Sequence, residues 1–114
     1  MILDFVIGNF YDDVELELIK DEGISRPRMR PVGAFPLEMR VEVSRQLREL
    51  FPLGTRFKAN VKVCQKHLGA KPNGPPYLRV YEIGVVVSSI KDKGLVAKLD
   101  PSGKDGRKYY YIYE

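Results

Sequence analysis

The chain has 114 residues, of which 44% are hydrophobic and 30% are charged, and its formal net charge is +4. This length suits a single domain, residues 1–114, and the composition excludes a disordered chain. The single cysteine excludes a disulfide within the chain and fits a reducing compartment. No apolar run approaches the ~20 residues of a membrane-spanning helix, so we expect a cytoplasmic protein without membrane association.

Charge is distributed unevenly along the chain. Residues 1–22 carry seven acidic side chains and one lysine, a net charge of −6, whereas the remainder carries a net charge of +10. Such asymmetry predicts either an acidic segment that docks on a basic surface of the same chain, or a basic surface that binds an anionic partner.

The first third of the chain predicts two strands and a loop. Residues 2–8 are apolar apart from one aspartate and predict a strand rather than a signal peptide. Residues 9–12 would form the hairpin connection to residues 13–19, where apolar and acidic residues alternate as in a half-buried strand. Proline and glycine predict an extended loop over residues 23–36.

Residues 36–51 predict the helix of the fold. Pro36 suits a first helical position, Pro52 ends the segment, and the apolar side chains fill one broad arc of a helical wheel. Residues 37–43 also alternate as a strand would, but sixteen residues without glycine favour a helix. Arg40 falls within the apolar arc, which makes it a possible ligand anchor.

The remaining chain predicts strands and turns. The expected strands are residues 55–66, 77–90, 95–99 and 107–113. Residues 67–76 would be a turn-rich loop, Gly84 a bulge or bend, and the last two strands a hairpin around residues 100–106. The predicted order is β-β-α-β-β-β-β, an α+β fold with a mainly antiparallel curled sheet or small β-barrel of about six strands and one amphipathic helix.

A row of basic side chains is the strongest functional feature. Because side chains alternate along a strand, one face of residues 55–66 carries Arg56, Lys58, Asn60, Lys62, Cys64 and Lys66. Residues on that face are roughly 6.6 Å apart, close to the phosphate spacing of an extended single strand of nucleic acid. Alternatively, the acidic row over residues 13–17 pairs with this strand and neutralises it, or the face is simply solvated.

Tyrosines and arginines add to this pattern. Tyr77 and Tyr81 share one face of a predicted strand with Arg79 between them, and could stack on bases. One face of the last strand carries Tyr109, Tyr111 and Tyr113. These could form a homodimer interface, or all the tyrosines could be structural. Two arginines of the loop, Arg28 and Arg30, could clamp phosphates.

The sequence favours a non-enzymatic module that binds nucleic acid, DNA or RNA. The predicted ligands are Arg56, Lys58, Lys62, Lys66, Arg79, Tyr77, Tyr81, Arg28 and Arg30. The alternatives are a homodimeric assembly protein that uses the C-terminal tyrosine strand, and a half-barrel that binds a small molecule through Arg40. The single cysteine and single histidine, Cys64 and His67, give little basis for catalysis, and we expect no catalytic residue, no metal site and no cofactor.

Overall fold

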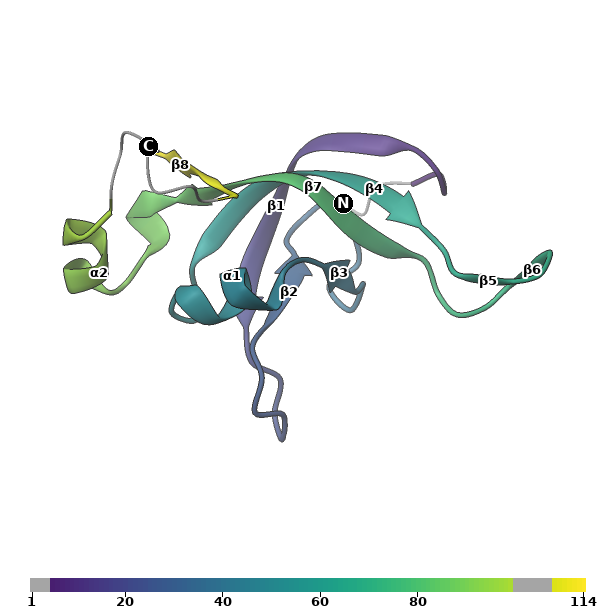
Figure 1. Cartoon of the computed structure of the whole chain (residues 1–114), viewed down its shortest axis with the longest axis horizontal. Helices are drawn as coiled ribbons and strands as arrows, with labels where there is room; N and C mark the ends of the chain where they lie inside the picture. Colours follow the sequence, from purple (N-terminus) through teal and green to yellow (C-terminus); the bar gives the residue numbers. More distant parts are fainter. Residues whose placement is uncertain (1–4, 100–107) are drawn as a thin grey trace.

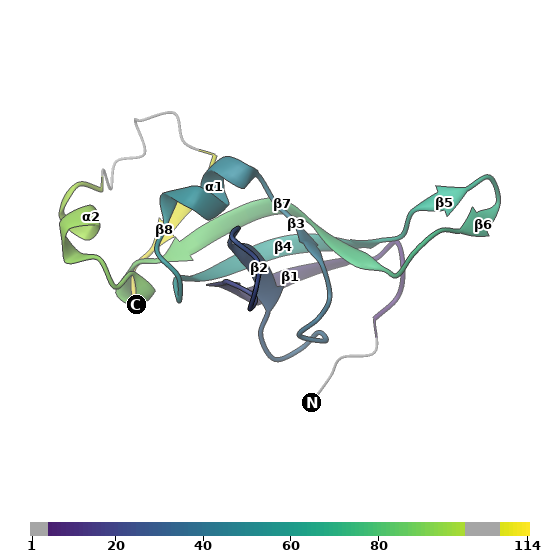
Figure 2. The ribbon, with the colours of Figure 1, turned by 90° about the horizontal axis from the view of Figure 1, so that it is seen from below.

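The structure is a computed structural model that describes residues 5–99 and 108–114, and its centre is a curled sheet of six strands (Figure 1). These strands are β1 (Phe10–Ile19), β2 (Arg28–Pro31), β3 (Val41–Glu42), β4 (Arg56–Cys64), β7 (Tyr77–Val86) and β8 (Tyr110–Ile112). They follow the order β2-β1-β4-β7-β3, and β8 also pairs with β7. The two ends of this order, β2 and β3, are in contact, so the sheet is a nearly closed barrel (Figure 2). The predicted α+β fold is confirmed.

The sheet is mainly antiparallel but not entirely. β1 pairs antiparallel with β2 and β4, and β4 pairs antiparallel with β7. Both β3 and β8 run parallel to β7, along the edge opposite β4. A separate two-stranded arm, β5 (His67–Leu68) and β6 (Lys71–Pro72), projects from the barrel along the longest axis of the molecule. The predicted turn-rich loop over residues 67–76 is therefore a short hairpin.

Alternation along the strands builds the core. The strands β1, β4 and β7 supply most of the buried side chains: Val14, Leu16, Leu18, Phe57, Ala59, Val61, Val63, Leu78, Ile83 and Val85. Side chains from β2, the loops and the first helix cover the other side, among them Met29, Phe35, Met39, Leu47 and Phe51. The ring of Phe51 packs edge-on against Phe57, with centroids 5.7 Å apart.

The predicted N-terminal strand and hairpin are wrong. Residues 1–4 lie outside the described part, and residues 5–9 form a turn rather than a strand. Gly8 has a φ of +95°, and the Asn9 amide donates to the carbonyl of Val6. This left-handed conformation suits glycine, and it ends any extended run before β1. β1 then begins at Phe10, so residues 9–12 are not the connection of a hairpin.

The predicted helix over residues 36–51 is also wrong. The Met39 amide donates to the carbonyl of Pro36 and closes a turn, and Val41 and Glu42 form the strand β3. Val41 pairs with Leu78 of β7, so only the end of the alternating segment over residues 37–43 is a strand. The helix α1 (Arg45–Leu50) is short. Ser44 is its N-cap, and the Ser44 hydroxyl accepts a hydrogen bond from the Leu47 amide at 3.1 Å. Pairing with a distant strand therefore overrides the local pattern that favours a helix over residues 41–42.

The C-terminal segments differ from the predicted hairpin. β7 ends at Val86 and continues as a 3₁₀ turn, η1 (Val87–Ser89). Residues 95–97 belong to the helix α2 (Lys93–Ala97) and not to a strand, and β8 pairs with β7 instead. The predicted hairpin tip, residues 100–106, lies outside the described residues. Within residues 5–99 and 108–114, no helix is long and apolar enough to cross a membrane.

Two β-bulges lie on either side of Asn60. In β1, Asp12 and Asp13 together oppose this residue, and the Asp13 amide donates to its side-chain Oδ1 at 3.2 Å. In β7, Tyr81 is the extra residue, because Asn60 pairs with Glu82 while the next residue of β4 pairs with Val80. The bulge predicted at Gly84 is therefore found three residues earlier. The two bulges divide the outer face of the sheet into two halves.

Candidate nucleic-acid interface

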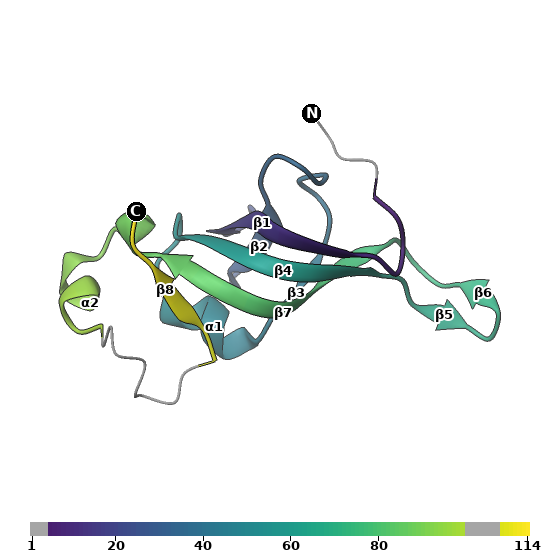
Figure 3. The ribbon, with the colours of Figure 1, turned by 90° about the horizontal axis from the view of Figure 1, so that it is seen from above.

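The outer face of the sheet is built by β1, β4 and β7, which lie side by side in Figure 3. The polar residues of β4 alternate with its buried ones, as the sequence predicts. Pairing with β1 sets Glu17 opposite Arg56 and Glu15 opposite Lys58. The acidic row therefore lies directly beside the first half of the basic row.

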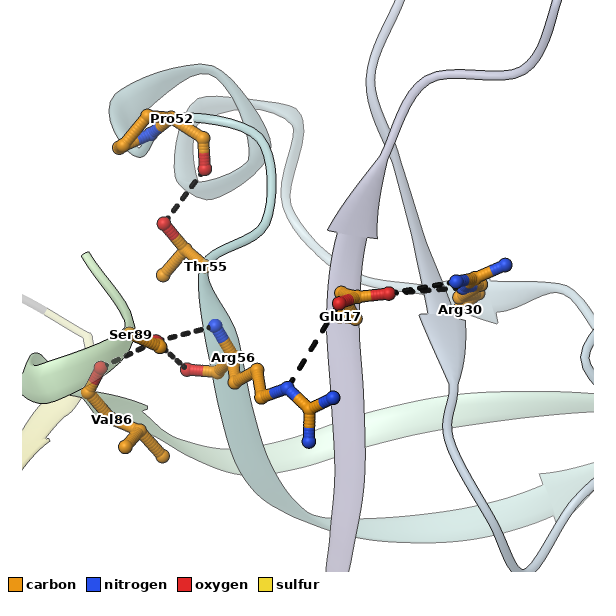
Figure 4. Close-up of polar contacts among 7 residues, drawn as sticks. All are labelled: Glu17, Arg30, Pro52, Thr55, Arg56, Val86 and Ser89. Atoms are coloured by element: carbon orange, nitrogen blue, oxygen red, sulfur yellow. Dashed lines mark hydrogen bonds and ion pairs between the residues drawn. The ribbon is translucent and has the colours of Figure 1, made fainter. Parts of the chain in front are cut away.

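This half of the basic row is engaged within the chain. Glu17 contacts two guanidinium groups (Figure 4). Its Oε1 accepts a hydrogen bond from Arg30 Nη2 at 2.8 Å, and its Oε2 lies 3.9 Å from Arg56 Nε. Arg28 forms an ion pair with Asp21 in the same way. Three of the predicted phosphate ligands thus have a carboxylate partner already.

Lys58 is balanced as well. Its Nζ donates to Oε1 of Glu114 at 2.6 Å. This hydrogen bond, and the attraction of the Glu114, Glu15 and Asp13 charges, raise the pKa of Lys58 above its ordinary value. The lysine stays protonated, but its charge faces carboxylates of the same chain.

Side-chain hydrogen bonds fix the start of β4. The Thr55 hydroxyl donates to the carbonyl of Pro52 at 2.7 Å (Figure 4). The Arg56 amide donates to the Ser89 hydroxyl at 2.7 Å, and that hydroxyl donates to the carbonyl of Val86 at 2.6 Å. These bonds tie the start of β4 to the turn before it and to η1.

The second half of the outer face carries exposed aromatic rings. Phe10 of β1 is 61% exposed and Tyr81 of β7 is 55% exposed, and their ring centroids are 5.3 Å apart. Lys62 of β4 pairs with Phe10, and its Nζ lies 5.4 Å from the centre of that ring. Lys62 forms no ion pair with any described residue. We call Phe10, Lys62 and Tyr81 the aromatic platform.

Arg79 borders the aromatic platform. It pairs with Lys62 across β4 and β7, and its Nη2 donates to the hydroxyl of Tyr77 at 3.4 Å. Hydrogen bonding to Tyr81 and the nearby groups of Tyr77 and Glu42 raise the pKa of Arg79. Tyr77 is buried, so it holds the guanidinium in place and is not itself a stacking surface. Of the two tyrosines predicted to stack, only Tyr81 offers an open ring.

The β5–β6 arm continues this half of the face beyond the barrel. The arm carries Lys66 and Lys71, which are exposed and form no ion pair within the described chain. Its two sides are held together by the Asn73 amide, which donates to the carbonyl of Lys66 at 2.7 Å, and by the Gln65 amide group, which donates to the carbonyl of Gly74 at 3.0 Å. Cationic side chains therefore run from the aromatic platform onto the arm.

A cleft of about 520 Å³ opens beside Tyr81, along the edge of β7 between β3 and β8. Val80 and Ile83 of β7 and the apolar side chains of α1 form its walls. Its polar lining residues are Ser44, Gln46, Lys108 and the tyrosines Tyr81 and Tyr109. Because Tyr81 lines this cleft and also belongs to the aromatic platform, the two features are continuous.

The C-terminal tyrosines form a chain of rings. Tyr109 packs edge-on against Phe51, Tyr111 against Tyr109, and Tyr113 against Tyr111, with centroids 5.5 to 6.3 Å apart. Tyr113 is exposed, whereas Tyr109 and Tyr111 are half-buried. Their role in a homodimer interface stays a prediction.

Arg40 and the two candidate catalytic residues lie elsewhere. Arg40 is exposed, contrary to its predicted place in an apolar helix arc, and it lines a cavity between β2 and β3. The Cys64 thiol contacts the carbonyl of Lys62, while the His67 ring bonds the carbonyl of Gln65. Within residues 5–99 and 108–114, no three side chains of metal-binding type gather at one point.

Phe10 is the site residue that sequence reasoning missed. Counting back by twos from Glu15 and Asp13 would place Tyr11 on the outer face. The β1 bulge shifts this alternation by one residue, so Tyr11 turns inward against Phe35, at 5.5 Å between centroids, and Phe10 turns outward. The positive φ of Asp13, 54°, marks the shift, and aspartate is one of the few residues that tolerates such a conformation.

Comparison of the chain with protein-family models, with curated proteins and with solved structures finds no match.

Proposed function

We propose that this protein binds single-stranded nucleic acid on the second half of its outer face, over the aromatic platform and along the β5–β6 arm. The observation that carries the proposal is the pair of exposed rings, Phe10 and Tyr81, with Lys62 beside them on the strand between.

The aromatic pair supports a single strand rather than a duplex. Large aromatic side chains are normally buried, and two exposed rings in contact lack the burial that stabilises such pairs elsewhere. Unpaired bases stack on exposed rings of a sheet, and each stacked base contributes ~1–3 kcal/mol. In a duplex the bases already stack on each other and cannot reach the rings.

The charge pattern supports the same half of the face. Arg28, Arg30, Arg56 and Lys58 have carboxylate partners, so a nucleic acid would have to displace an internal ion pair to reach them. The cations near the platform and on the arm have fewer such partners: Lys62, Lys66, Lys71 and Arg79, of which Arg79 lies 3.5 Å from Glu42. Each phosphate contacted by a cation contributes a slope of about −0.7 to the dependence of log K on log salt for single strands. Four contacts predict a slope of about −3.

Binding is tested with fluorescently labelled single-stranded DNA and RNA oligonucleotides, by anisotropy over a range of salt concentrations. We expect saturable binding with a slope near the value above, and weaker binding to the matching duplex. The absence of binding at low salt would overturn the proposal.

Charge-reversal variants make the test specific to this half of the face. Lys62→Glu should weaken binding far more than Lys58→Glu, because Lys58 is already balanced by Glu114. Lys93→Glu is the matched control, since it makes the same charge change on α2, at the far end of the molecule from the arm (Figure 1). Equal losses in all three variants would mean that binding follows net charge alone, which contradicts the proposed site.

The rings are tested in the same way. Tyr81→Ala should weaken binding by about 5- to 150-fold, the equivalent of the ~1–3 kcal/mol expected for one stacked base. Tyr113→Ala removes a similarly exposed ring directly after β8, which pairs with the C-terminal end of β7, and should leave binding unchanged.

A further inference from the structure

A second cavity lies at the seam where β2 and β3 meet. Its volume is about 440 Å³, and three arginines from separate elements line it: Arg28 of β2, Arg40 just before β3, and Arg48 of α1. β2 and β3 are the two ends of the sheet order, and β4 is its middle strand. In a curled sheet the ends meet opposite the middle, so the seam is on a different side of the barrel from the aromatic platform.

Arg48, one of the residues that line this cavity, has an unused hydrogen-bond donor. Its Nη1 donates to the carbonyl of Pro27 at 3.3 Å, which holds the side chain against the loop before β2. Its Nε is buried and has no hydrogen-bond acceptor in the described part of the chain. A guanidinium group does not lose its proton in proteins, so this N–H needs an acceptor. An oxyanion in the cavity would supply one.

The charges around the cavity favour an anion. Asp21 lines it but is already paired with Arg28. Arg40 forms no ion pair with any residue that the structure describes. With Glu38 as the second acidic residue of the lining, three arginines face two carboxylates, and the net charge of the lining is +1.

We propose that this seam binds a phosphate group, held by Arg40 and by the buried Nε–H of Arg48. Guanidinium groups present planar forks of N–H donors that match the oxygens of phosphate, and two forks from different elements hold a tetrahedral anion better than one. Arg28 pairs with Asp21 and so balances the charge of that carboxylate in the lining. The site shares no residue with the aromatic platform, so its test is separate from that of the proposed nucleic-acid interface.

The test is a titration of the intact protein with inorganic phosphate, followed by NMR of the arginine Nε–H signals. We expect the Arg48 signal to shift with saturation. Arg40→Gln, an exposed substitution with little effect on folding, should weaken binding at least tenfold. Glu38→Gln should strengthen it, because it removes a competing carboxylate from the lining. Arg45→Gln is the matched control on α1: Arg45 pairs with Glu49 and does not line the cavity.

The phosphate group could belong to a small molecule or to a nucleic-acid backbone, and the same signal distinguishes these sources. If short oligonucleotides move the Arg48 signal and Arg40→Gln weakens their binding, the source is a backbone phosphate. If free phosphate moves it and oligonucleotides do not, the source is a small molecule. An Arg48 signal that neither ligand moves, or equal effects of Arg40→Gln and Arg45→Gln, would overturn the proposal.

Discussion

Gly84 of β7 lies beneath side chains of the neighbouring strand β8, and replacing it with alanine tests how firmly β8 is attached. Gly84 pairs with Tyr110, and a Cβ atom added there would lie 2.3 Å from Cε2 of the Tyr110 ring and 2.7 Å from Cδ1 of Ile112. Ordinary van der Waals contact begins at 3.4 Å, so the ring would have to retreat by about 1 Å.

Two opposing effects set the size of the change in stability. Forcing an extra carbon into packed side chains costs ~1–3 kcal/mol. Alanine gains roughly 0.5–1 kcal/mol over glycine inside a strand, because it loses less backbone entropy on folding. Tyr110 is 40% exposed and can move outward, so the cost should stay moderate. We expect Gly84→Ala to lower the free energy of unfolding by about 1–2 kcal/mol.

Urea unfolding of a double-mutant cycle measures this cost. In a background of Tyr110→Ala with Ile112→Val, the atoms that obstruct the new methyl group are gone. Gly84→Ala should then be neutral or slightly stabilising, which reverses its sign. Hydrogen exchange should show faster exchange of the β8 amides in the single variant, while those of β1 and β4 remain protected. An equal destabilisation in both backgrounds would refute the assigned steric cause.

Three further predictions concern the barrel itself. Ser44→Ala removes the acceptor of the Leu47 amide at the start of α1 and should cost about 1 kcal/mol in urea unfolding, with Ser44→Asp as the variant that retains the cap. The hydrogen bond from Arg45 and the positive charge of Arg45 lower the pKa of Glu49. The pair therefore stabilises the fold at a pH above the ordinary carboxyl pKa, and this stabilisation is lost as the pH falls through the lowered pKa of Glu49. An NMR titration should show that Arg45→Gln raises the pKa of Glu49 again, and no change would contradict the contact. Phe57→Ala empties a fully buried position and should cost ~3–5 kcal/mol in the same unfolding assay, whereas a cost below 1 kcal/mol would mean that the core is not packed as described.

The sequence predicted the three central strands of the sheet, two of them from regular alternation. Residues 13–19 lie within β1 and residues 55–66 contain β4, because a period of two sustained over seven or more residues is typical of a half-buried strand and does not fit a helix. Residues 77–90 contain β7. Residues 37–43 satisfied both a helical and a strand pattern. The strand conformation of Val41 and Glu42 depends on β7, some forty residues away in the chain, and no local pattern reports such a partner.

The candidate site was predicted in part for a similar reason. The basic face of β4 follows from alternation alone. Which of its cations retain a free charge depends on the register between β1 and β4, and on the contact of Lys58 with Glu114 at the far end of the chain. The pairing of the acidic and basic rows, left open by the sequence, gives Arg56 a carboxylate partner in Glu17. Lys58 is balanced by Glu114, and Lys62 has no ion pair with a described residue.

Both rings of the aromatic platform depend on an irregularity in a strand. Phe10 reaches solvent because β1 has one extra residue before Val14, and Tyr81 is itself the extra residue of β7. Deleting Asp13 would restore the regular alternation of β1, so that Tyr11 and Phe10 would exchange sides while residues 14–19 kept their places. The aromatic surface can thus be created or removed by one-residue insertions and deletions that leave the core sequence unchanged. A lineage of such chains could gain or lose this surface without refolding the barrel.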